Sequence, residues 1–68
     1  MQLSARNQLP GRITSVHLGE VMAEVQVDIG GGKTPVSAIT RGSAESMELR
    51  EGLDVVVVIK ATEVLIGR

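Results

Sequence analysis

Hydrophobic and polar residues alternate along much of this 68-residue chain, with the period of two that is typical of β-strands. The most regular stretch is 21–29, where Val, Ala and Ile at odd positions alternate with Met, Glu, Gln and Asp at even positions. Residues 12–18 are rich in β-branched side chains and end at Gly19, a turn residue. The pattern therefore predicts two successive strands, preceded by a bend or strand start at Pro10 and Gly11.

Three glycines and a lysine at 30–33 interrupt the alternation before a third extended run at 34–39. Glycine adopts positive φ at no steric cost, so this segment is typical of a hairpin loop. A phosphate-binding loop is the alternative interpretation, but that motif requires a helix directly after its Gly-Lys-Ser/Thr ending. Because Pro35 and a strand pattern follow here, the sequence favours the hairpin.

Thr40 ends the third run and precedes residues 41–47, which have the composition of a short helix. Threonine is a favoured N-cap because its hydroxyl accepts a hydrogen bond from a free N–H of the first turn. Those N–H groups, with the hydroxyls of Thr40 and Ser43, form a patch that could bind an anion, although most such caps only stabilise the helix.

Residues 53–59, with valine at every position from 55 to 58, form the most apolar run and predict a strand that is buried on both faces. In a small barrel on its own, one face of each strand is exposed to solvent. A strand that is apolar on both faces therefore indicates a subunit interface. Residues 60–63 interrupt it, and 64–66 predict a last short strand. The expected fold is a single all-β domain, residues 1–68, with one short helix: a five-stranded OB-like barrel of order β-β-β-α-β-β, in an oligomer.

Composition supports oligomerisation. A chain of this size buries only about 60% of the surface that its unfolded form exposes, so its own core is marginal. The sequence has no cysteine for disulfides, and its single histidine makes a structural zinc site improbable. Burial against further copies of the chain is the remaining way to stabilise the fold.

The same composition argues against several functional classes. A net charge of −1 and the absence of aromatic residues disfavour nucleic-acid binding on an OB-like fold, which uses basic grooves and stacked bases. No segment is long and apolar enough for a membrane span or a signal peptide, so we expect a cytoplasmic protein with no membrane partner. His17 lies in a predicted strand with no cysteine nucleophile, and no paired carboxylates are apparent, so we expect no enzymatic activity.

Two segments carry candidate binding chemistry, residues 3–9 and residues 59–62. Each places a cation, Arg6 or Lys60, beside small residues and hydroxyls. Fixed positive charge, O–H donors and little steric bulk are what an oxyanion requires. We therefore expect the two segments to converge on one anion site, although ordinary solvated cations would give the same local pattern.

These two segments, together with Ala38-Ile39-Thr40, Ser43 and residues 49–52, closely resemble the molbindins, small molybdate-binding proteins whose module is also called a TOBE or Mop domain. The resemblance covers essentially the whole chain. The Ser-Ala-Arg-Asn opening is fairly specific, and the Lys-Ala-Thr near the end lies at a matching distance from it.

The resemblance implies a cytoplasmic store or buffer for molybdate or tungstate, with no catalytic cofactor. It further implies a hexamer of OB-like subunits, built as a trimer of dimers, with oxyanions at subunit interfaces. An oxyanion-sensing module of a transporter or transcription regulator is the alternative, and the initiator Met1 without a linker favours the stand-alone protein. Carried over by position, the oxyanion-binding residues are Ser4, Ala5, Arg6, Thr40, Ser43, Lys60 and Ala61. Such a site excludes carboxylates, so Glu45 and Glu63 are expected to point elsewhere.

Overall fold

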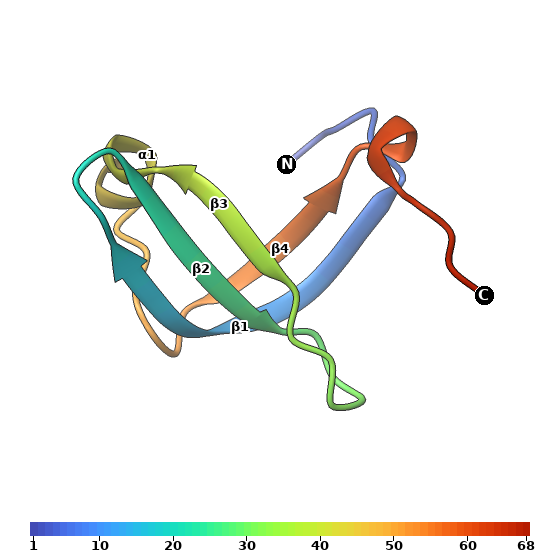
Figure 1. Ribbon diagram of the computed structural model, residues 1–68, viewed down its shortest axis with the longest axis horizontal. Helices are drawn as coiled ribbons and strands as arrows, with labels where there is room; N and C mark the ends of the chain where they lie inside the picture. Colours follow the sequence, from blue (N-terminus) through green and yellow to red (C-terminus); the bar gives the residue numbers. More distant parts are fainter.

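A strongly curled antiparallel sheet forms the body of the protein in the computed structural model, which describes residues 1–68 (Figure 1). Its strands are β1 (Asn7–Leu18), β2 (Met22–Asp28), β3 (Val36–Thr40) and β4 (Asp54–Ile59), in the order β3-β2-β1-β4. Helix α1 (Arg41–Ser46) connects β3 to β4, and a 3-10 helix, η1 (Ala61–Glu63), follows β4. Neither helix has the length and apolar character that crossing a bilayer requires.

The central strand β1 pairs with two different neighbours along its length. Its first half, from Asn7 to Arg12, pairs with β4, and its second half, from Arg12 to Leu18, pairs with β2. A β-bulge between Ile13 and Ser15 bends the strand just after the change of partner. The sheet therefore curls about β1 into a half-barrel, and β3 and β4 become its two free edges (Figure 1).

Gly11 of β1 lies close to the end of β2. A Cβ atom at this position would lie 2.6 Å from Cγ1 of Val27 and 2.7 Å from the backbone oxygen of Asp28. Because the backbone oxygen cannot move aside like the end of a flexible side chain, only glycine fits here without a shift of the strands.

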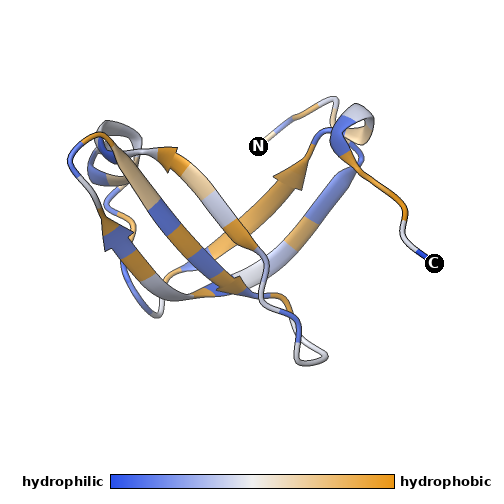
Figure 2. Ribbon diagram, viewed as in Figure 1, coloured by the Kyte–Doolittle hydropathy of each residue, from blue (hydrophilic) through white to orange (hydrophobic).

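The core lies on the inner face of the curled sheet and is small. Only five residues are fully buried, and Ile13, Val25 and Val27 form its centre. Along β2 buried and exposed residues alternate without exception, as the sequence pattern predicted, and Figure 2 shows the matching bands of apolar and polar residues. The residues around this centre are only partly buried: Val16, Ile29, Ile39, Leu49, Leu53, Val55 and Val57.

The hairpin and the helix cap predicted from the sequence are confirmed. Gly30 and Lys33 form an isolated β-bridge, and all three glycines of the loop have positive φ, between 63° and 92°. Thr40 is the N-cap of α1, and its Oγ1 accepts a hydrogen bond of 3.1 Å from the Ser43 N–H.

The expected bend at Pro10 and Gly11 was wrong, because β1 begins at Asn7 and runs straight through both residues. Proline is tolerated because this part of β1 has a partner strand, β4, on one side only, so a missing N–H need not break a ladder. The third strand also begins later than expected, at Val36 instead of residue 34.

The expected fifth strand at 64–66 is not formed within the chain, so the single chain is a half-barrel and not a closed five-stranded barrel. After η1 the chain continues as an extended tail, with Leu65 91% exposed and Ile66 90% exposed. Burial of β4 on both faces is also not reached in one copy, because Val56 and Val58 are each 42% exposed. The exposed apolar side chains of residues 64–66 and of β4 therefore have no surface to pack against in the same chain.

Replacing Gly11 with alanine should lower the free energy of unfolding by roughly 1–3 kcal/mol, because the added methyl group would force β1 away from β2. Urea denaturation followed by circular dichroism measures this change. Gly42→Ala is the matched control: its Cβ would meet nothing within 4 Å and it lies in α1, so stability should stay equal or rise by up to about 1 kcal/mol. Equal effects of the two substitutions would contradict the close approach at Gly11.

Candidate functional site

Five of the seven candidate residues lie together where β1 begins and β4 ends. We call this group the basic cluster; its members are Ser4, Ala5, Arg6, Lys60 and Ala61. Asn7 and Ile59 form the last strand pair, so the chain enters the sheet after Arg6 and leaves it before Lys60 at the same end of the sheet. Gln8 Nε2 donates a hydrogen bond of 2.7 Å to the backbone oxygen of Ala5 and fixes the approach of the N-terminal segment. The N-terminal segment and η1 accordingly lie side by side (Figure 1).

Both cations of the basic cluster lack an acidic partner. The protein contains two salt bridges, Arg12 with Asp54 and Arg41 with Glu45, and neither involves Arg6 or Lys60. An anion bound at this end of the β1–β4 pair would interact favourably with both positive charges. Glu63, in η1, is exposed and forms no salt bridge with either cation.

The other two candidate residues, Thr40 and Ser43, form the hydroxyl cluster at the start of α1. The Thr40 hydroxyl accepts from the Ser43 N–H and donates to Ser43 Oγ at 2.8 Å. The Thr40 proton is therefore committed to Ser43, whereas the Ser43 hydroxyl proton has no acceptor within the chain. In this arrangement Ser43 is the free donor and Thr40 orients it.

Arg41 fixes α1 against the turn between β1 and β2. Its Nη1 donates to the Gly19 oxygen at 3.2 Å, its backbone N–H donates to the Val21 oxygen at 2.8 Å, and its Nε pairs with Glu45. Residues of a helix are about 100° apart, so Ser43 projects roughly opposite Arg41 and Glu45. The Glu45 carboxylate is held by Arg41, on the side of α1 away from Ser43, which agrees with the expectation that it points away from an anion.

The two clusters lie at opposite ends of β1. The basic cluster adjoins Asn7, whereas Thr40 is paired with Met22 beside the far end of the strand, at Leu18. Twelve residues of β-strand span about 40 Å along a straight path, and the longest dimension of the whole protein is 34 Å. One copy therefore does not bring the two clusters around a single small anion, as the separation of α1 from η1 in Figure 1 shows.

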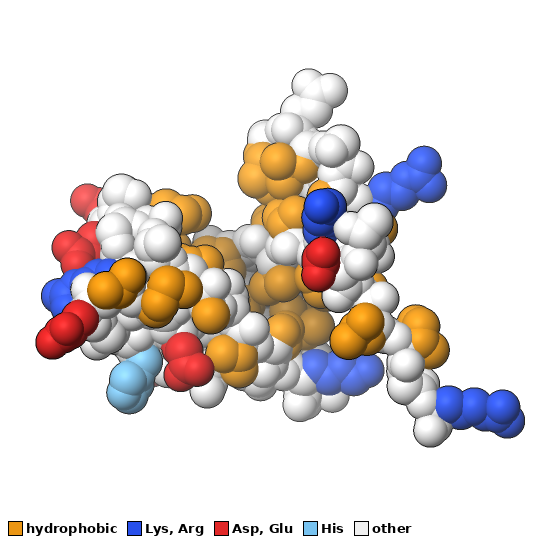
Figure 3. Space-filling model, turned by 45° about the horizontal axis from the view of Figure 1, so that its top comes forward, with side chains coloured by type: hydrophobic (Ala, Val, Ile, Leu, Met, Phe, Trp, Pro, Cys, Tyr) orange, Lys and Arg blue, Asp and Glu red, His pale blue; other side chains and the backbone are white.

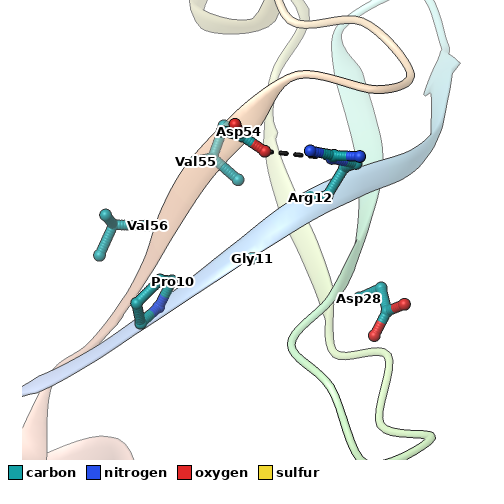
Figure 4. Close-up of a pocket in the computed structure, with 7 residues that line it drawn as sticks. All are labelled: Pro10, Gly11, Arg12, Asp28, Asp54, Val55 and Val56. Atoms are coloured by element: carbon teal, nitrogen blue, oxygen red, sulfur yellow. Dashed lines mark hydrogen bonds and ion pairs between the residues drawn. The ribbon is translucent and has the colours of Figure 1, made fainter.

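Two hollows that the sequence did not predict lie away from both clusters. The first, of about 620 Å³, is open and is drawn in Figure 4: Pro10, Gly11, Arg12, Asp28, Asp54, Val55 and Val56 line it. Arg12 Nε and Asp54 Oδ1 are 3.1 Å apart, and both side chains are largely exposed. With two carboxylates and one compensated arginine, this hollow is poorly suited to an anion.

The second hollow, which we call the apolar groove, has a volume of about 210 Å³ and lies between the two edges of the curled sheet. Apart from Ser37 its walls are entirely apolar, and Figure 3 shows apolar side chains inside the hollow of the molecule. It is lined by Ile13, Val25, Val27, Ser37, Ile39, Met47, Leu49 and Val55 to Val58. None of the candidate oxyanion-binding residues contributes to it.

Most of the remaining titratable groups lie on the surface. His17 is exposed on β1 opposite Glu24. No group of three or more His, Asp or Glu side chains is arranged to hold a metal ion.

Comparison with known proteins defines the class. Residues 3–66 match the model of the TOBE domain, and the chain belongs to this family. It is 44% identical over 66 residues to molybdenum-pterin-binding protein 3 of Clostridium pasteurianum, and the match covers 97% of both chains. It is 40% identical over 67 residues to a probable molybdenum-pterin-binding protein of Haemophilus influenzae, and that match covers 98% of this chain and 97% of the relative. The resemblance to the molbindins is thus confirmed.

Solved structures agree with this assignment. MopII from Clostridium pasteurianum, in an apo form, superposes with a TM-score of 0.93 at 39% identity and covers 98% of this chain and 100% of its own. A molybdate-binding protein from Sporomusa ovata gives 0.92 at 34% identity over the whole of both chains. The cytoplasmic molybdate-binding protein ModG, with molybdate bound, gives 0.84 at 41% identity over 90% of this chain and 43% of that one.

Thr40→Ala should lower the free energy of unfolding by about 1 kcal/mol, because the Ser43 N–H would lose its acceptor and α1 its cap. Urea denaturation without added oxyanion measures the loss. Thr40→Ser keeps the hydroxyl and should restore most of the stability. A serine variant as unstable as the alanine variant would show that the hydroxyl is not what stabilises α1.

Proposed function

We propose that this protein binds molybdate, or the closely similar tungstate, as an intact oxyanion and acts as a cytoplasmic store or buffer for it. The observation that carries the proposal is that Arg6 and Lys60, two cations without salt-bridge partners, flank the last strand pair of β1 and β4 among small residues. Relatives of the same length and fold are named for binding molybdate or a molybdenum pterin, and ModG is described as cytoplasmic. These relatives are binding proteins, which also supports a role without catalysis.

The chemistry of the anion matches the donors that the two clusters offer. Molybdate at neutral pH is a tetrahedral dianion with four acceptor oxygens and no proton to donate, so a dry site must supply hydrogen-bond donors and about two positive charges. Arg6 and Lys60 supply the charges, and the hydroxyls of Ser4 and Ser43 supply donors. The N–H of Ala5 makes no hydrogen bond within the chain and is a further donor, and the methyl side chains of Ala5 and Ala61 leave room for close approach.

A complete site requires two copies of the chain. Because the basic and hydroxyl clusters lie at opposite ends of β1, one copy would contribute Ser4, Arg6 and Lys60 and a neighbour would contribute Thr40 and Ser43. The exposed apolar side chains of Val56 and Val58 support assembly, since their burial would be favourable. A hexamer built as a trimer of dimers, with anions at its subunit interfaces, is the assembly we propose.

An oxyanion-sensing module is the second candidate. The molybdenum transport protein ModE of Azotobacter vinelandii is 35% identical over 66 residues, but the matched region is only 24% of that protein. We favour storage because the relatives from Clostridium and Haemophilus consist almost entirely of the matched domain. We propose no nucleic-acid partner for this domain, because its net charge is −1 and it lacks the aromatic residues on which bases stack.

Arg6→Ala and Lys60→Ala should each weaken molybdate binding by about 10- to 100-fold, because each removes a charge-assisted hydrogen bond from the anion. Isothermal titration calorimetry measures the affinity, and native mass spectrometry checks that the variants still assemble. Lys33→Ala is the matched control, since this exposed lysine lies in the glycine hairpin and should not affect binding. Unchanged affinity in both cluster variants would refute the site.

Molybdate should bind at least about tenfold more tightly than sulfate, a difference of about 1.4 kcal/mol. The larger anion reaches donors on both subunits at once, and sulfate does not. Calorimetric competition between the two anions at constant ionic strength measures the ratio. Equal affinities would show that charge alone, without fixed spacing of the donors, governs binding.

A further inference from the structure

A single hydrogen bond ties the N-terminal segment of the basic cluster to the sheet. Residues 1–6 precede β1 and take part in no backbone hydrogen bond, and neither their side chains nor the terminal amine forms a salt bridge. Gln8 Nε2 donates to the backbone oxygen of Ala5 at 2.7 Å, and the segment makes no other hydrogen bond. The conformation of Ser4-Ala5-Arg6 therefore depends on the side chain of Gln8.

Gln8 itself belongs to the ordered part of the sheet. It is paired with Val58 in the ladder between β1 and β4, one residue inside the last pair, Asn7 with Ile59. Its side chain is exposed and reaches three residues back along the chain. A residue whose backbone is fixed by the ladder thus holds a segment that lies outside it.

The hydrogen bond sets the orientation of the peptide group between Ala5 and Arg6. This peptide is trans, so its carbonyl oxygen and its N–H point in opposite directions. Because the Ala5 oxygen points to the Gln8 amide, the Arg6 N–H points away from that amide, and it has no hydrogen-bond partner in the chain. One contact therefore occupies an acceptor and leaves a donor free.

We propose that Gln8 is a positioning residue of the oxyanion site, which turns the Ala5 oxygen away from the anion and presents the Arg6 N–H to it. This role rests on the proposed binding of molybdate at the basic cluster. All four oxygens of molybdate are acceptors, so a carbonyl oxygen that faced the anion would repel it, whereas a free N–H would bind it. Gln8 acts through the peptide group and does not touch the anion.

Glutamine suits this role better than the other long polar side chains. Only its NH₂ group can donate to a carbonyl oxygen, which fixes the orientation of the amide. An ionised glutamate only accepts hydrogen bonds and would repel both the Ala5 oxygen and the anion. A lysine would donate, but it would add a charge to those of Arg6 and Lys60, which already supply the roughly two charges that a dianion needs.

The benefit to binding is order in the segment before the anion arrives. A segment that is free to rotate must be ordered when the anion binds, and the entropy lost in that step weakens binding. Gln8 removes part of this cost through one neutral hydrogen bond. The net contribution of such a bond corresponds to a change in affinity of about 3- to 10-fold.

Gln8→Met tests this role, because methionine keeps the length of the side chain and removes the donor. Isothermal titration calorimetry with molybdate, at constant ionic strength, should show binding weakened by about 3- to 10-fold. Gln26→Met is the matched control: Gln26 is an exposed strand glutamine of β2 whose side chain makes no hydrogen bond, so affinity should be unchanged. Gln8→Glu should weaken binding more than Gln8→Met, whereas Gln26→Glu, with the same added charge, should not.

Nuclear magnetic resonance gives a second measurement that a purely structural role of Gln8 would not affect. In the ¹⁵N-labelled native protein, saturation with molybdate should shift the Arg6 amide proton downfield, because this N–H gains a charge-assisted hydrogen bond. In Gln8→Met the shift should be smaller. The measurement on the native protein does not require any variant to fold, and native mass spectrometry checks that the variants assemble like it.

The outcomes separate this role from the function on which it rests. Molybdate binding by the native protein with the same affinity in Gln8→Met, or with equal losses in the two methionine variants, would overturn the role of Gln8 and leave the proposed function intact. An Arg6 amide proton that does not shift when molybdate is bound would also overturn it. Absence of molybdate binding by the native protein would overturn the proposed function and the role of Gln8 together.

Discussion

The shared strand β1 is the constraint on which the rest of the structure depends. Its first half pairs with β4 and its second half pairs with β2, and Gly11, just before the change of partner at Arg12, leaves the space that Val27 and the Asp28 backbone occupy. The curl of the sheet, the position of Ile13 in the small core and the placement of the N-terminal segment beside η1 all follow from this one strand.

The same strand decides where the binding chemistry lies. Because β1 spans the molecule, it joins the basic cluster at one end to the hydroxyl cluster at the other, and a single copy offers two incomplete sets of donors. In the assembly proposed above, the interface that buries the exposed valines would also bring the two unlike clusters together. A domain with only five buried residues would then gain stability and a binding site from the same contacts.

Local sequence patterns predicted the elements whose structure depends on neighbours in the chain. The alternation of β2, the glycine hairpin and the cap at Thr40 are all set within a few residues and were all found. The first half of β1 was missed because Pro10 and Gly11 usually end strands, and only the lack of a second partner makes them tolerable here. The tail at 64–66 has a strand pattern but no partner in its own chain, so the pattern alone could not say whether it would pair.

The sequence by itself determined the family, the strand-forming segments and the residue types that an oxyanion needs, because composition, alternation and short motifs are local properties. Only the tertiary structure decided how those residues are grouped: it placed Arg6 and Lys60 at one end of β1, far from Thr40 and Ser43 at the other. Strand pairing sets those distances, and pairing depends on register between segments that are distant in the chain, which no local pattern specifies.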